Sequence, residues 1–150
     1  MNIREHPRYF LKVGDEDHSI ECFDDVIAKI ESALAGSSGS IHLCADDGFR
    51  PKWQQFVFGA KIYIRSYFMI EWANNTCALI FHDHSDSEYR ALSPSEPEDL
   101  SVHTRTKISF GEPEALDRKY CMTKEMSAKV VREFLELGVR PKWLEYEFVK

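Results

Sequence analysis

Hydrophobic and polar residues alternate along several short stretches of the chain, and this period of two predicts β-strands. Asn74 and Asn75 separate two of the strongest stretches. Because asparagine tolerates a positive φ angle, this pair predicts a two-residue hairpin turn. A turn is also expected at residues 46–48, where two aspartates precede a glycine. The predicted strands cover residues 9–13, 41–45, 53–58, 61–65, 67–73, 76–82, 102–110 and 142–149.

Two further stretches carry apolar residues at spacings of three and four, the period of a helix with one buried face. The first helix is expected to begin after Ser19, a candidate N-cap, and to end near residue 35. The second is expected to begin after Thr123, another candidate N-cap, and to stop at Gly138. Pro141 then prevents the helix from resuming.

The order of these elements is strand, helix, about five strands, helix and strand. Consecutive strands joined by short turns pair in antiparallel fashion. We therefore predict a single α+β domain over residues 1–150, with an antiparallel sheet of about six or seven strands and two amphipathic helices packed on one face. With 150 residues, of which 43% are hydrophobic and 29% charged, the chain is long enough for one such core.

The composition argues against several classes of protein. The longest apolar run is about six residues, whereas a membrane helix needs about 20, so no membrane partner is predicted. No apolar segment follows the first residues, MNIREHPRYF, so the chain is expected to stay in the compartment where it is made. The cysteines form no C-x-x-C pair, which argues against a zinc ribbon, and reduced thiols are expected. The four cysteines are Cys22, Cys44, Cys77 and Cys121.

Negative charge is concentrated in one segment. The chain has a formal net charge of −6, and residues 83–99 hold six acidic residues against the single base Arg90. Serine and proline are frequent there, so the segment is predicted to be a loop. Clustered negative charge favours docking to a basic partner and argues against direct binding of nucleic acid, although a loop that only keeps the protein soluble has the same composition. The predicted contact residues are Asp83, Asp86, Glu88, Glu96, Glu98 and Asp99.

One motif suggests catalysis. His82 and His84 lie two residues apart at the end of a predicted strand, where they project to the same side and, with Asp86, could share a metal ion. The pattern H-x-H-x-D resembles the start of metallo-β-lactamase-type metal sites, but those continue with histidine where this chain has Ser87. A polar strand end that enters an acidic loop has the same residues. We therefore expect no metal, no cofactor and no catalytic residue, and keep a small metal-dependent hydrolase as the alternative.

The segment 126–146 reads MSAKVVREFLELGVRPKWLEY, an amphipathic helix that runs through E-F-L and G-x-R-P into a strand with aromatic residues. It resembles the C-terminal signature of immunity-protein family one of bacterial polymorphic toxin systems. In that family a helix ends in a phrase like E-F-L-x-T-G-x-R-P, and a strand with an aromatic residue, usually Trp, follows. Here Leu137 stands where threonine is common, and Tyr146 where tryptophan is expected. The resemblance covers about residues 120–147, and the matching residues are Glu133, Phe134, Leu135, Gly138, Arg140 and Pro141.

The resemblance implies a small cytoplasmic bacterial protein of the contact-dependent growth inhibition type. Such proteins bind the C-terminal domain of a cognate toxin, 1:1, often a nuclease or a nucleic-acid deaminase, and block it. An acidic segment would cover the basic active site of such a toxin. Within the signature, Gly138 is expected to close the helix, Arg140 to cap its carbonyl groups and Pro141 to redirect the chain. A scaffold module without a tight partner is a third alternative.

Overall fold

The computed structural model describes residues 8–20, 23–49, 62–83, 87–137 and 139–149. These residues form one antiparallel sheet with the strand order β2-β1-β3-β4-β5-β6-β8, and β7 pairs with β5 beside this path. The helices are α1 (Phe23–Leu34), α3 (Val102–Lys107) and α4 (Lys124–Leu137), and Arg118–Tyr120 form a 3₁₀ turn, η1. The strands are β1 (Arg8–Val13), β2 (Glu16–Ile20), β3 (Ser38–Phe49), β4 (Ile62–Ala73), β5 (Thr76–Asp83), β6 (Glu88–Ala91), β7 (Met122–Thr123) and β8 (Tyr146–Phe148). The predicted α+β fold is confirmed.

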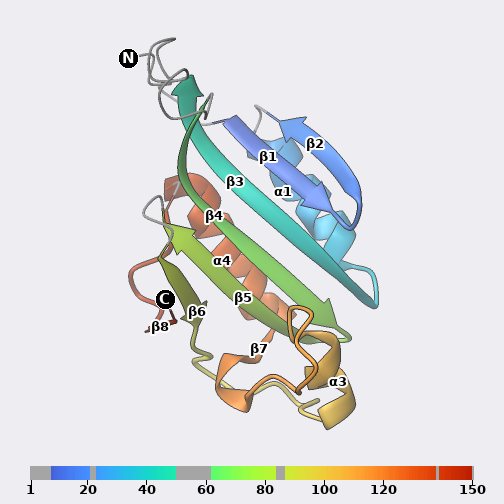
Figure 1. Cartoon of the computed structure of the whole chain (residues 1–150). Coiled ribbons are helices and arrows are strands. Elements are labelled where there is room, and N and C mark those ends of the chain that lie inside the picture. Colours follow the sequence, from blue (N-terminus) through green and yellow to red (C-terminus); the bar gives the residue numbers. More distant parts are fainter. Residues whose placement is uncertain (1–7, 21–22, 50–61, 84–86, 138, 150) are drawn as a thin grey trace.

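Helices α1 and α4 cover one face of the sheet (Figure 1). Each turns an apolar stripe toward the strands, and Val26 of α1 and Val130 of α4 are buried in the same core. In the middle of this core, the ring centroid of Phe134 lies 4.9 Å from that of Phe68 and 5.8 Å from that of Phe81. Aromatic packing between α4 and the central strands therefore fixes this helix on the sheet.

Residues 92–121, which we call the second layer, pack on the opposite face at the end of the sheet near the β4–β5 turn (Figure 1). Ile108, Leu116 and Cys121 are buried there against Ala73 and Ala78. Side chains alternate between the two faces along a strand, so these two alanines point away from the α1–α4 core. The sheet is thus covered on one face by two helices and on part of the other by the second layer.

Two local predictions about turns and caps are confirmed. Asn74 has a φ angle of +56° in the β4–β5 hairpin, as expected for a residue that tolerates left-handed backbone. The hydroxyl oxygen of Thr123 accepts a hydrogen bond of 3.2 Å from the backbone N–H of Met126 and so caps the start of α4. The predicted stop of this helix, Gly138, lies outside the described residues, as does the predicted strand at 53–58.

The predicted start of the first helix is wrong. Ser19 belongs to strand β2, where it pairs with Phe10 of β1, and α1 begins only at Phe23. The residues before the helix fit the period of a helix as well as that of a strand. Pairing with the neighbouring strand β1 decides in favour of the strand. The predicted turn at 46–48 is also wrong, because β3 continues to Phe49. Its pairing with β4 shifts register between Ala45 and Gly48, so the aspartates and the glycine accompany a β-bulge.

The predicted strand at 102–110 is wrong, because its first residues form helix α3. The Ser101 hydroxyl accepts a hydrogen bond of 3.2 Å from the N–H of Thr104 and caps the helix, although the segment alternates like a strand. Three other predicted strands differ from those observed: 61–65 and 67–73 are replaced by the single strand β4, which begins at Ile62, and the strand at 142–149 is reduced to β8. None of the described helices is long and apolar enough to cross a membrane.

Candidate functional site

The acidic segment 83–99 is not one continuous loop, because β5 extends to Asp83 and β6 occupies Glu88–Ala91. Glu88 is buried, and its Oε1 lies 3.3 Å from Nε2 of His82. The pairing of β6 with β5 places these two residues opposite each other, so their contact is built into the sheet. The carboxylate of Glu88 therefore contacts His82 inside the protein.

Asp99 is likewise engaged within the fold. It accepts hydrogen bonds from the hydroxyl of Thr104 (2.6 Å) and the backbone N–H of Ser101 (3.2 Å). These bonds, that of Thr104 first, lower the pKa of Asp99 to about 2. Of the other predicted contact residues, Glu96 and Glu98 are exposed, whereas Asp86 and the side chain of Asp83 lie outside the described part.

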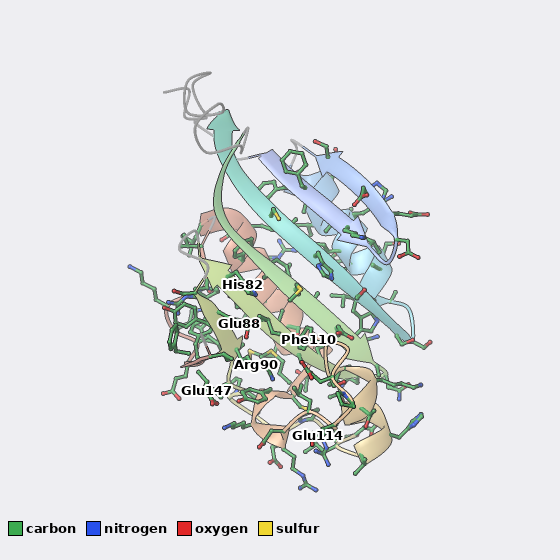
Figure 2. The ribbon with its side chains drawn as sticks, viewed as in Figure 1. His82, Glu88, Arg90, Phe110, Glu114 and Glu147 are labelled. Atoms are coloured by element: carbon green, nitrogen blue, oxygen red, sulfur yellow. The ribbon has the colours of Figure 1, made fainter. Side chains whose placement is uncertain are left out.

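A row of charged residues crosses β5, β6 and β8 on the face opposite α1 and α4, and Figure 2 shows its members His82, Glu88, Arg90 and Glu147. Glu147 pairs with Arg90 in the strand register. Its carboxylate accepts a hydrogen bond of 2.8 Å from the Tyr120 hydroxyl and lies 2.9 Å from Nζ of Lys119. The hydrogen bond with Lys119 is the main cause that lowers the pKa of Glu147 and raises that of Lys119.

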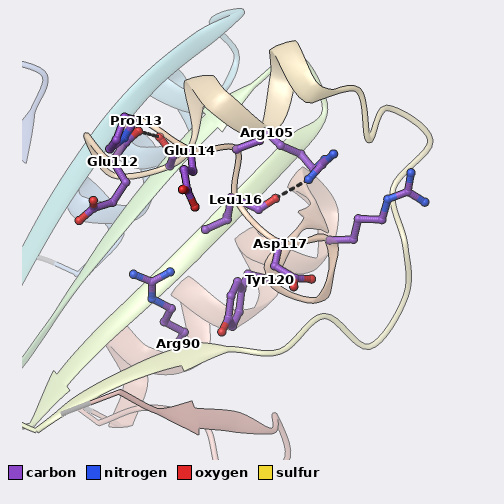
Figure 3. A pocket seen from close by; sticks show the side chains of 11 residues that line it. Arg90, Arg105, Glu112, Pro113, Glu114, Leu116, Asp117 and Tyr120 are labelled. Carbon is purple, nitrogen blue, oxygen red and sulfur yellow. Dashed lines mark hydrogen bonds between the residues drawn. The ribbon is translucent and has the colours of Figure 1, made fainter.

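A groove with a volume of about 850 Å³ opens between this row and the second layer. Arg90 and Tyr120 form its floor, and Glu114 and Leu116 project into it from the second layer (Figure 3). The guanidinium carbon of Arg90 lies 5.3 Å from the centroid of the Tyr120 ring. Its Nε is shielded from solvent and has no hydrogen-bond partner among the described residues.

The wall of the groove depends on Arg105 of α3. Its Nε donates a hydrogen bond of 2.9 Å to the carbonyl oxygen of Leu100, and its Nη1 donates one of 2.8 Å to that of Leu116. Charged donors satisfy backbone carbonyls that have no strand or helix to pair with. Arg105 is thus a structural residue of the second layer. The exposed carboxylates that line the groove belong to Glu112, Glu114 and Asp117.

The groove has no signal in the sequence because its residues come from β6, α3, η1 and the loop between the last two. The acidic residues of this loop are visible in the sequence as G-E-P-E-A-L-D at 111–117. No periodic signal connects this loop to Arg90. The strand assigned to 102–110 also placed Arg105 on a sheet, whereas helix α3 directs it to the carbonyl groups beneath it.

The residues of the C-terminal signature fall into two groups. Phe134, Leu135 and Pro141 are buried, so they have structural roles. The guanidinium carbon of Arg140 lies 3.8 Å from the centroid of the Tyr89 ring and 4.7 Å from that of Tyr146. These ring contacts were not expected, and the capping of helix carbonyls by Arg140 stays a prediction.

Two further contacts tie the signature together. The Tyr146 hydroxyl donates a hydrogen bond of 2.6 Å to the carbonyl oxygen of Pro141. The indole N–H of Trp143 donates one to the carboxylate of Glu133. The chain after α4 is therefore held back against the end of the helix.

Exposed apolar side chains gather in the same segment. Among the described residues six large hydrophobic side chains are exposed, and five of them lie between residues 137 and 149. Phe148 is 61% exposed and Trp143 45%. We call these five residues the C-terminal patch: Leu137, Val139, Trp143, Phe148 and Val149.

The candidate metal residues are only partly described. His84 and Asp86 lie outside the described part of the chain, and Nε2 of His82 faces Glu88. Within the described ranges, no group of three or more His, Cys, Asp or Glu residues is arranged to hold a metal ion.

Burial is the main cause that raises the pKa of the Cys77 and Cys121 thiols to about 11, so both are neutral thiols at physiological pH.

Comparison with known proteins does not place the chain in a family. No protein-family model matches the chain, and no curated protein is significantly similar to it. The resemblance of residues 126–146 to the immunity-protein signature therefore stays a prediction.

Proposed function

We propose that this protein is an immunity protein that binds the C-terminal domain of a cognate toxin, 1:1, and neutralises it by covering its active site. The observation that carries the proposal is the C-terminal patch. Exposed apolar side chains concentrated in one segment of the chain favour a surface that binds other proteins. The patch includes Trp143 and Phe148, and Tyr and Arg residues adjoin it; these residue types dominate the energetics of protein interfaces.

The position of the patch supports the proposal further. It lies within and directly after the segment that resembles the immunity-protein signature. Phe134 and Pro141 hold this segment to the core, and Arg140 stacks between two tyrosine rings. An aromatic surface held in this way loses little conformational entropy on binding, which favours tight association.

The charge of the protein supports a basic partner. The chain has a net charge of −6, and the second layer exposes Glu96, Glu98, Glu112 and Glu114. A nuclease or a nucleic-acid deaminase presents a basic cleft to its substrate, and a negative protein is steered toward it at a higher rate. In the proposal, Glu96 and Glu98 keep the role predicted for them, and binding takes place in the bacterial cytoplasm.

The test is a protection assay in bacteria that express the C-terminal domain of the product of the adjacent upstream gene. We expect the wild-type chain to restore growth and to form a salt-sensitive 1:1 complex with that domain. Phe148→Asp should weaken the complex by about 30-fold or more, as expected at a central interface residue. The matched control is Val102→Asp, because Val102 is 63% exposed and lies outside the patch.

The outcomes separate the competing functions. Growth that the wild-type chain does not restore would contradict the immunity function. Equal protection by both variants would contradict a role for the C-terminal patch. Stoichiometric zinc in the purified protein, with a hydrolase activity that His84→Ala abolishes, would favour the metal-dependent hydrolase instead.

A further inference from the structure

The charged residue at the floor of the groove is Arg90. No ion pair joins it to a carboxylate among the described residues. Glu147, its partner in the strand register, accepts from Tyr120 and pairs with Lys119, and the charge of Arg90 is the smallest of the causes that lower the pKa of Glu147. Arginine recognises carboxylates through paired hydrogen bonds, so an arginine without an ion pair at the floor of a groove is a candidate site for a carboxylate.

The position of Arg90 is fixed before any ligand arrives. It belongs to β6, which is paired on both sides, with β5 and with β8. Its guanidinium group stacks on Tyr120, and the hydroxyl of that tyrosine is held by Glu147. A guanidinium group held by a sheet and an aromatic ring has little entropy left to lose on binding.

The lining of the groove carries charges of both signs. The lining includes Arg90, Arg105 and Arg118 together with the exposed carboxylates of Glu112, Glu114 and Asp117. Arg105 is engaged with the carbonyl groups of the second layer. The formal charges of these six residues cancel, so the groove suits a segment that itself carries both signs.

We propose that the groove binds a carboxylate side chain of the partner that is flanked by lysine or arginine. The carboxylate would pair with the Nη atoms of Arg90, and the flanking cations would lie at Glu112 and Glu114. This inference rests on the proposed function and names the chemistry of the toxin segment. A volume of about 850 Å³ is larger than one side chain needs and fits a short peptide segment.

Charge and shape favour a carboxylate over a phosphate. The planar fork of a guanidinium group matches a carboxylate through two parallel hydrogen bonds. A phosphate monoester carries about −1.5 to −2 charges at neutral pH and would be repelled by the carboxylates of the lining. A single carboxylate between basic residues can pair with Arg90, while its basic neighbours pair with the carboxylates of the lining.

The test uses the isotope-labelled full chain and capped tripeptides, followed by NMR of the arginine Nε–H groups. The Nε of Arg90 is shielded from solvent, so its proton should exchange slowly and give a visible signal. Arg90→Lys identifies that signal by its disappearance. We expect Lys-Glu-Lys to shift it in a saturable way, and Lys-Gln-Lys to bind about tenfold more weakly or worse. Inorganic phosphate at the same concentrations should leave it unshifted.

Three results would overturn the inference: no saturable shift with Lys-Glu-Lys, an equal shift with Lys-Gln-Lys, or an equal shift with phosphate. The readout does not involve the toxin, so its failure differs from failure of the proposed function. Growth restored in the protection assay without a peptide shift would leave the immunity function and remove the carboxylate site. A peptide shift without restored growth would support the carboxylate site and contradict the immunity function.

The toxin complex provides a second measurement. Arg90→Lys should weaken it by about tenfold, because lysine lacks the planar fork. The matched control Arg132→Lys changes an exposed arginine of α4 outside the groove and should alter affinity less than about twofold. Equal effects of both variants would contradict a specific role of Arg90. The urea unfolding midpoints of both proteins show whether they remain folded.

Discussion

The two faces of the sheet are covered by different means. On one face, α1 and α4 bury long apolar side chains, among them Phe134 against Phe68 and Phe81. On the other, the second layer has a much smaller apolar core and depends on hydrogen bonds from side chains such as Arg105 to backbone carbonyls. The comparison shows how one domain combines a face that stabilises the fold with a face that displays charge.

The difference follows from the energies involved. Burying a large apolar side chain stabilises the fold by about 1.5–3 kcal/mol, whereas a hydrogen bond contributes about 0.5–1.5 kcal/mol net. An irregular segment held by hydrogen bonds can turn its charged residues outward, as Glu112 and Glu114 do, but it should open locally more often than a helix face. Three predictions test this comparison.

The largest effect is expected for Phe134→Ala. Removal of a fully buried ring between Phe68 and Phe81 should lower the free energy of unfolding by about 3–5 kcal/mol. The matched control is Phe148→Ala, where the same substitution at an exposed ring should cost less than about 1 kcal/mol. Urea unfolding measures both, and similar losses for the two variants would contradict the placement of Phe134.

A smaller and more local effect is expected for Arg105→Met. The variant leaves the carbonyl groups of Leu100 and Leu116 without their donor and should cost about 2 kcal/mol. Hydrogen exchange should speed up in the second layer and remain unchanged in α4. Lys107→Met, an exposed change in the same helix, is the control. Equal acceleration in α4 would mean that the two faces unfold as one unit.

The smallest effect is expected in the rates at which a cysteine on each face of the sheet is labelled. Cys77 lies in the core beneath the helices and Cys121 in that of the second layer, and burial raises the pKa of both thiols to about 11. In variants that retain one of these cysteines and no other, labelling by a disulfide reagent at pH 8 should therefore report how often each face opens. We expect Cys121 to react about tenfold faster. Equal rates in the native protein would contradict a less stable second layer, and urea-unfolded protein is the control for intrinsic reactivity.

Much of the helix face could be predicted from the sequence. The apolar spacing of α4, its Thr123 cap and the Asn74 turn are local features, and each contains its own signal within a few residues. The first helix was placed too early because Ser19 fits a helix cap as well as an edge strand. Only the pairing of β2 with β1 distinguishes the two.

The candidate site could be predicted only in part. The acidic residues of 83–99 are evident in the sequence, yet Glu88 pairs with His82 and Asp99 with Thr104 inside the fold. Which carboxylates are exposed depends on the strand register and on the second layer. The groove at Arg90 joins residues from β6, α3 and η1, and such long-range proximity has no periodic pattern.

The sequence by itself determined the α+β class, the amphipathic face of α4 and the hairpin between β4 and β5, because spacing and turn chemistry act over neighbouring residues. The tertiary structure decided that Val102–Lys107 form a helix, that Glu88 is buried and that Phe148 is exposed. Those outcomes depend on which strand lies beside each residue and which layer covers it. Burial and pairing are properties of the assembled sheet, and they decide where local preferences are ambiguous.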